Sequence, residues 1–131
     1  MTDQPQQSME DVIRADGRYP MEAYAFLHEG LTKAVKEAHG GEPAPGVRRH
    51  VTGRQICDAM RGLAVERWGL LAPTVLGRWN IRGTMDFGNM VYLLIKHNLM
   101  RKTAEDRLED FRDVYRFEDA FRPPVDFELK E

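Results

Sequence analysis

The stretch from Thr84 to Phe117 constrains the fold more than any other part of this sequence. Thr84 can cap a helix, and Asp86 lies in the first turn, where a negative charge is favoured. The helix is predicted to stop at Asn98, in a left-handed conformation followed by a hydrophobic contact from Leu99. Its apolar residues recur at helical spacing: Phe87, Met90, Val91, Leu94 and Ile95. The pattern predicts an amphipathic helix with a defined start and end.

The residues after this helix predict a β-wing. A first strand is expected at residues 99–102, a charged turn at 103–106 and a returning strand at 111–117, whose Val-Tyr-Arg-Phe run favours β-structure. A further helix is the alternative, because the apolar residues between 108 and 115 also lie at helical spacing.

Two helices are predicted before Thr84. Thr52 and Gln55 form a capping box, in which the hydroxyl and the amide each satisfy a backbone N–H, and Gly69 ends the helix that starts there. Its apolar stripe is Ile56, Met60, Leu63, Ala64 and Trp68. A second helix is expected at residues 72–79, followed by a turn in which Ile81 is the buried anchor.

The N-terminal part predicts two more helices. Ser8 can cap a short one, and Pro20 suits the start of a longer one that ends at Gly40. The longer helix has its apolar stripe at Tyr24, Leu27, Leu31, Val35 and Ala38. It is expected to pack on the helices that follow.

This order of elements predicts a mainly α protein with a winged helix-turn-helix-like core of three helices and a small β-wing, centred on residues 50–117. The domain organisation is expected to be a disordered N-terminus at 1–7, a single globular domain at 8–121 and an extended acidic tail at 122–131.

The composition indicates a soluble, cytoplasmic protein. The longest apolar run, Met90–Ile95, is far shorter than the roughly 20 residues of a membrane-spanning helix. The polar, acidic first residues do not resemble a secretory signal. The single cysteine, Cys57, excludes an internal disulfide and suits a reducing compartment.

Charge is segregated along the chain. Residues 48–102 contain ten Lys and Arg against three Asp and Glu. The flanking segments are acidic, with four basic against eight acidic residues at 1–47 and five against ten at 103–131. A basic centre of this kind is typical of a surface that binds a polyanion. Alternatively, the acidic ends neutralise the centre within the fold.

The basic centre supplies most of the candidate site residues. In a winged helix-turn-helix protein they would lie beside the phosphate backbone, and Asn89 is the best candidate for reading a base. The candidate set is Arg48, Arg49, Arg78, Arg82, Asn89, Lys96, Arg101 and Lys102. The predicted function is non-enzymatic binding of DNA or RNA through the phosphate backbone.

No catalytic or cofactor motif occurs in the sequence, and no cofactor is expected. His28 and His39 share a helical face but lie about 16 Å apart, too far for one metal ion. The alternative function is a protein-interaction adaptor that uses a helical face and an acidic, aromatic C-terminal segment. Its aromatic residues either face a partner or pack on the domain: Phe111, Tyr115, Phe117, Phe121 and Phe127.

A family resemblance is carried by three runs, RRHVTGRQICDAMR, APTVLGRWNIRGTMDFGNMVYLLIKHNLMRKT and DFRDVYRFEDAF. They resemble a small family of uncharacterised bacterial proteins found mainly in planctomycetes and verrucomicrobia, over about residues 20–121. The resemblance implies a bacterial, cytoplasmic protein and lends no catalytic or binding residue. Separately, LLIKHNLMRKTAEDRLEDFRDVY is similar to the helix-to-wing passage of winged-helix regulators.

Overall fold

The computed structural model describes residues 8–40, 51–100 and 107–121, and all regular elements within these ranges are helical. The prediction of a mainly α fold is therefore confirmed. The α-helices are α1 (Met9–Asp16), α2 (Met21–His39), α3 (Gly53–Trp68), α4 (Ala72–Arg78), α5 (Thr84–Lys96) and α6 (Phe117–Ala120). Two 3₁₀ turns join them, η1 (Gly69–Leu71) and η2 (Leu108–Phe111).

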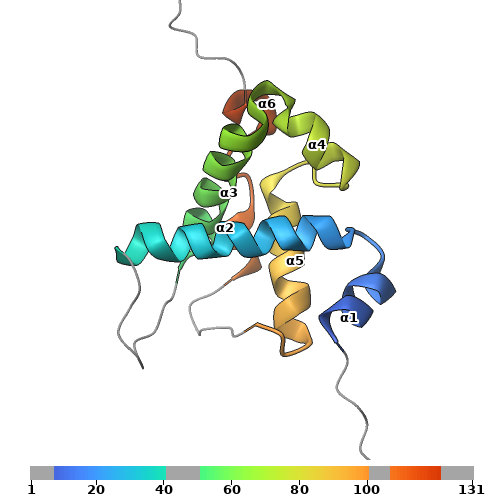
Figure 1. Cartoon of the computed structure of the whole chain (residues 1–131). Coiled ribbons are helices and arrows are strands. Elements are labelled where there is room, and N and C mark those ends of the chain that lie inside the picture. Colours follow the sequence, from blue (N-terminus) through green and yellow to red (C-terminus); the bar gives the residue numbers. More distant parts are fainter. Residues whose placement is uncertain (1–7, 41–50, 101–106, 122–131) are drawn as a thin grey trace, which may run out of the picture.

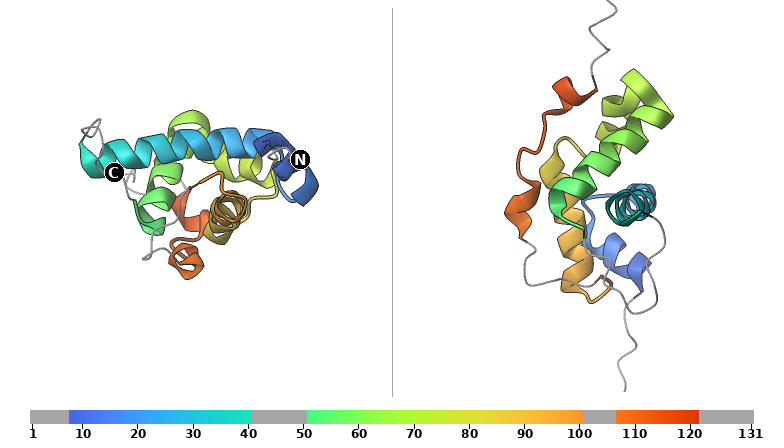
Figure 2. Two further views of the ribbon diagram at one scale, coloured as in Figure 1. Left: turned by 90° about the horizontal axis from the view of Figure 1, so that it is seen from below. Right: turned by 90° about the vertical axis from the view of Figure 1, so that its left-hand side faces the viewer.

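The helices form three layers. Helix α2 crosses α3 and α5 on one side of the molecule (Figure 1). The segment that contains η2 and α6 runs along the other side of α3 and α5 (Figure 2). Helices α3 and α5 therefore form the middle layer, covered from both sides.

Three of the predicted helix ends are confirmed, those at Ser8, Thr52 and Asn98. The Ser8 hydroxyl accepts a hydrogen bond from the Asp11 N–H at 3.1 Å, and both bonds of the Thr52–Gln55 capping box are present. Asn98 has a left-handed backbone with φ +60°, and the N–H of the next residue donates to the Leu94 carbonyl at 2.7 Å. These helix ends are determined by neighbours in sequence, so they could be predicted.

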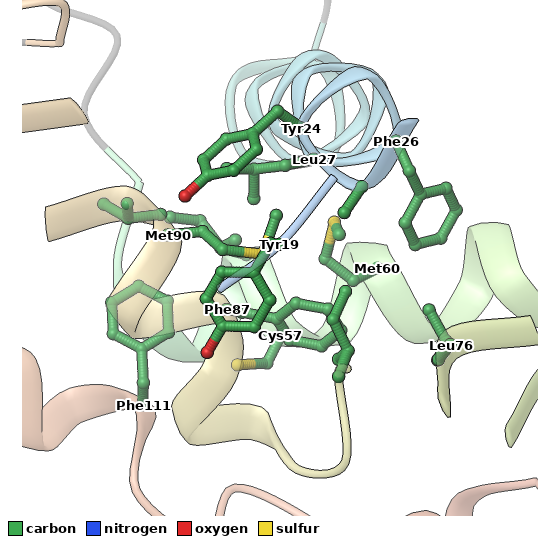
Figure 3. Packing of buried hydrophobic residues seen from close by; sticks show 14 of the residues in the cluster. Tyr19, Tyr24, Phe26, Leu27, Cys57, Met60, Leu76, Phe87, Met90 and Phe111 are labelled. Carbon is green, nitrogen blue, oxygen red and sulfur yellow. The ribbon is translucent and has the colours of Figure 1, made fainter. Parts of the chain in front are cut away.

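The core lies where α2 meets α3 and α5 (Figure 3). Phe26 packs against Trp68 and Trp79, with ring centres 5.0 and 5.9 Å away. On α2 the buried stripe differs from the predicted one, and Ala38 is exposed. The buried residues of α2 are Ala23, Tyr24, Phe26, Leu27, Gly30 and Ala34. Small residues replace large ones at this crossing because a Cβ on Gly30 would lie 2.0 Å from the Met60 sulfur.

The predicted returning strand at 111–117 is wrong. Phe111 ends η2 and is 3% exposed, because its ring packs on α5, and Phe117 begins α6. Between them, Asp113 has a left-handed backbone with φ +48°, which interrupts an extended strand. Residues 99 and 100 are also not in a strand, and residues 101–106 lie outside the described ranges.

Thr84 is not the cap of α5. Gly83 takes that position, and its N–H donates to Asp86 Oδ2 at 3.1 Å. The buried Thr84 hydroxyl donates to the Phe111 carbonyl at 2.6 Å and accepts from the Val114 N–H at 3.1 Å. The side chain thus fastens the η2 segment to α5.

The aromatic residues near the C-terminus pack on the domain. The ring centre of Phe117 lies 6.2 Å from that of Phe87 and 5.3 Å from that of Phe121. The Tyr115 hydroxyl donates to the Cys57 carbonyl at 2.7 Å. With Phe111 buried as well, packing is the correct interpretation for these four residues. Phe127 lies outside the described ranges.

Candidate nucleic-acid interface

Helix α5 occupies a position unlike that of a groove-reading helix. Between Thr84 and Lys96, only Lys96 is exposed, and both faces are covered by neighbouring layers. A recognition helix needs an exposed N-terminal half to enter the major groove. Helix α5 is therefore not placed to enter a groove with its N-terminal half.

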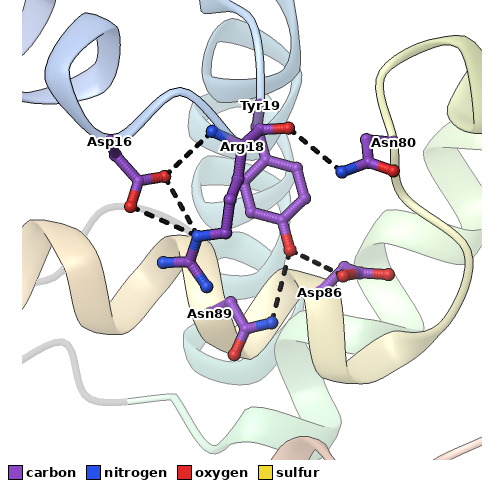
Figure 4. A network of polar contacts seen from close by, with 6 residues as sticks. All are labelled: Asp16, Arg18, Tyr19, Asn80, Asp86 and Asn89. Atoms are coloured by element: carbon purple, nitrogen blue, oxygen red, sulfur yellow. Dashed lines mark hydrogen bonds and ion pairs between the residues drawn. The ribbon is translucent and has the colours of Figure 1, made fainter.

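A polar network holds the start of α5 to the linker between α1 and α2 (Figure 4). Tyr19 is 4% exposed, and its hydroxyl donates to Asp86 Oδ1 at 2.6 Å and accepts from the Asn89 amide at 3.3 Å. Burial, together with the Asp86 carboxylate, raises the pKa of Tyr19 to about 12. Asn89, predicted to read a base, is thus engaged within the fold through its hydrogen bond to Tyr19.

The same linker is tied to the turn between α4 and α5. Asn80 donates from its amide to the Arg18 carbonyl at 3.3 Å, and Arg18 Nε contacts the Asp16 carboxylate at 3.1 Å (Figure 4). Burial raises the pKa of Asp16, but hydrogen bonds and charge attraction from Arg18 outweigh it and leave the pKa below its usual value. Asp16 is therefore ionised at neutral pH and fixes the Arg18 side chain.

A pocket of about 400 Å³ lies between this linker and the end of α4. Three of its lining residues are arginines, Arg14, Arg18 and Arg78. Arg14 is paired with Glu10 at 2.6 Å, and Glu10 also lines the pocket. Arg78 is exposed and has no hydrogen bond or ion pair with any residue in the described part of the chain. It therefore carries the uncompensated charge of this arginine pocket.

The structure separates the other predicted site residues. Arg82 turns back toward the Gly77 carbonyl at 3.5 Å and borders a smaller pocket of about 280 Å³ with Arg116. Lys96 lies at the opposite end of α5 from Arg82, about 20 Å from the start of the helix along its axis. Arg48, Arg49, Arg101 and Lys102 lie outside the described ranges.

Sequence reasoning missed the residues that accompany Arg78. Arg14 and Arg18 belong to the acidic N-terminal segment, about 60 positions away, and the sequence predicts Trp79 only as an inward-facing residue and Asn80 only as part of a turn. The one local signal is that Gly17 and Pro20 bracket Arg18, which indicates a linker and an accessible backbone. No sequence pattern shows that this linker meets the end of α4.

Two apolar features lie elsewhere on the surface. A pocket of about 420 Å³ between α1, α2 and the end of α5 has the methionines Met9, Met21 and Met100 among its lining residues. Leu70 and Leu71, on the turn between α3 and α4, are 60% and 65% exposed. Such patches are common at protein-interaction sites.

Within residues 8–40, 51–100 and 107–121, no three His, Cys, Asp or Glu side chains lie close enough together to hold a metal ion. None of the helices in these ranges combines the length and apolarity that crossing a bilayer requires. Comparisons of the chain with protein-family models, with curated proteins and with solved structures found no match.

Proposed function

We propose that this protein is a non-enzymatic nucleic-acid-binding protein that contacts phosphates through the arginine pocket and the adjacent turn between α4 and α5. The single observation that carries the proposal is that three arginines line this pocket, of which Arg78 is exposed and has no hydrogen bond or ion pair within the described part of the chain. Arg82 is exposed on the adjacent turn, where its guanidinium donates to the Gly77 carbonyl and the side chain borders the neighbouring smaller pocket.

The arginines around the pocket can exchange a carboxylate partner for a phosphate. Guanidinium groups bind phosphate through two parallel hydrogen bonds. The Arg14–Glu10 pair is largely exposed, and such pairs contribute only about 0.3–0.5 kcal/mol. An incoming phosphate can therefore draw Arg14 away from Glu10 at little cost, while Arg78 has no partner to exchange among the residues that the structure describes.

The polar groups of the pocket favour binding over chemistry. Its arginines cannot act as bases near neutral pH. Tyr19, with its raised pKa, stays protonated and donates to Asp86. These properties support a role in holding an anion.

The test is fluorescence anisotropy with labelled single-stranded DNA, duplex DNA and RNA, titrated across salt. We expect binding that weakens with salt, and Arg78→Ala should lower affinity and reduce the log–log salt slope by about 1. Arg54→Ala is the matched control, because Arg54 is an exposed arginine near the start of α3, on a different helix from the pocket. Absence of binding at low salt, or equal effects of the two variants, would refute the proposal.

A protein-interaction adaptor is the second candidate, favoured by the exposure of Leu70 and Leu71. This function predicts that a defined partner co-purifies with the protein and is lost in the double variant Leu70→Ser, Leu71→Ser. Capture that survives the double variant would remove this surface from the interpretation.

A further inference from the structure

We propose that the arginine pocket accepts one unpaired nucleotide of a single-stranded nucleic acid, with its phosphate on Arg78 and its base against Trp79. The inference rests on the proposed function and specifies its ligand. It follows from the shape of the pocket, from the two kinds of surface that line it, and from the way Trp79 and Asn80 are held.

The shape of the pocket favours a single strand. A concavity of about 400 Å³ falls within the size range of pockets that enclose small molecules, and it exceeds what one phosphate group fills. The backbone of a duplex is convex, and extracting a paired base costs a few kcal/mol. A single strand can turn one nucleotide into the pocket without that cost.

The lining combines apolar and charged residues. A bare phosphate would use the arginines and leave the apolar residues in contact with water. A nucleotide has a charged phosphate and a flat base, so it can contact both kinds of residue. The apolar contribution comes from Ile13, Tyr19, Pro20, Met21 and Trp79.

Trp79 is fixed in place before any ligand arrives. Its ring centre lies 5.9 Å from that of Phe26 and 5.6 Å from that of Trp68, and Trp79 is one of the residues that line the pocket. An aromatic ring that is already ordered loses little side-chain entropy when a base packs against it. Stacking of a base on an aromatic side chain contributes about 1–3 kcal/mol and does not depend on which base is present.

Asn80 supplies a group that can contact a base edge. Its backbone is left-handed, with φ +66°, and one amide N–H is held by the Arg18 carbonyl. The amide oxygen makes no hydrogen bond within the described residues, and the side chain borders the pocket. An oriented amide with a free acceptor can hydrogen-bond the exposed edge of an unpaired base.

The experiment compares a labelled single strand with a duplex of the same sequence by anisotropy, at one salt concentration. We expect the single strand to bind at least about tenfold more tightly, a difference of roughly 1.4 kcal/mol. Arg78→Ala should lower single-strand affinity about tenfold. Asn80→Gly tolerates the left-handed backbone, removes the amide together with its hydrogen bond to the Arg18 carbonyl, and should lower it a few-fold. Arg54→Ala should leave it unchanged.

Tryptophan emission gives an independent measurement. The chain has two tryptophans, so Trp68→Phe leaves Trp79 as the only emitter. Circular dichroism first establishes that this variant is folded. Unlabelled single strand, and adenosine monophosphate at higher concentration, should quench Trp79 emission. Binding by anisotropy without any change in emission would overturn the contact with Trp79.

The outcomes separate the inference from the proposed function. If single strand and duplex bind equally and Arg78→Ala weakens both, the protein binds nucleic acid through this surface but the single-nucleotide inference is wrong. If neither binds at low salt, both proposals fail. If the single strand is preferred but Asn80→Gly has full affinity, Asn80 has no part in the contact.

Discussion

The two sides of α5 contact the rest of the protein through different kinds of interaction, apolar packing on one side and hydrogen bonds on the other. Against η2, α5 makes a close apolar contact, in which a Cβ on Gly88 would lie 2.7 Å from Phe111 Cγ. Toward the linker between α1 and α2, the same helix is held by two hydrogen bonds at the Tyr19 hydroxyl, which donates to Asp86 and accepts from Asn89. A close-packed contact tolerates no added atom, whereas a hydrogen-bonded one can be weakened step by step. We infer that the first side carries stability and the second side sets the geometry of the arginine pocket.

Gly88→Ala tests the close-packed side most severely. The added methyl group would also lie 2.8 Å from Phe111 Cβ, which cannot move without its backbone. We expect the free energy of unfolding to fall by about 3 kcal/mol in urea denaturation. Gly62→Ala is the control, because its methyl would meet only the end of the Lys33 side chain, and alanine favours the helix. Equal stability of the two variants would show that η2 adjusts freely.

Thr84→Val examines the polar part of the same contact. The substitution keeps the shape but removes the donor to the Phe111 carbonyl and the acceptor for the Val114 N–H. We expect a loss of about 2 kcal/mol in the free energy of unfolding, since both backbone groups lose their partner. Thr84→Ser retains the hydroxyl and should lower the free energy of unfolding by less than Thr84→Val does. A stable valine variant would mean that water replaces both bonds.

Tyr19→Phe probes the hydrogen-bonded side and carries a pH signature. A tyrosine whose pKa is raised to about 12 by folding keeps its proton while the unfolded chain loses it above pH 10. The wild-type protein should therefore lose stability as pH rises from 10 to 12, and Tyr19→Phe should lose about 2 kcal/mol less across that window. At pH 7 the variant should be less stable by about 1 kcal/mol. Parallel pH profiles would contradict the placement of the Tyr19 hydroxyl.

Asp16→Asn should have the smallest effect on stability and a distinct effect on binding. The Arg18 side chain is about half exposed, so losing its ion pair should change the free energy of unfolding by less than about 1 kcal/mol. Arg18 would then gain an uncompensated charge beside the pocket. We expect single-strand affinity to rise severalfold, with a steeper salt slope. Unchanged affinity would show that Arg18 does not face the ligand.

Sequence alone predicts those features of this protein that depend on neighbours. The caps at Ser8 and Thr52 and the left-handed stop at Asn98 each involve residues within about five positions. The role of Thr84 could not be predicted, because its hydroxyl serves a carbonyl 27 positions away. The wing prediction failed for the same reason: η2 is set by its contact with α5, which β-propensity does not encode.

The candidate site shows the same limit. Arg78 was identified from its charge and its place beside a turn, which are local properties. Its association with Arg14 and Arg18 depends on how the α1–α2 linker reaches the end of α4. That meeting is produced by the crossing of α2 over the middle layer, so only a three-dimensional structure shows it.

The reactivity of Cys57 can report how often the core around α3 opens. The chain has one thiol, fully buried in α3, and burial raises its pKa to about 12. A protonated, enclosed thiol is inert to alkylating reagents, so modification occurs only during moments when the core separates. The rate of labelling under native conditions therefore reports how often α3 detaches from its neighbours. Every variant of the α5 contacts can be ranked by that rate, without denaturant and in the presence or absence of nucleic acid.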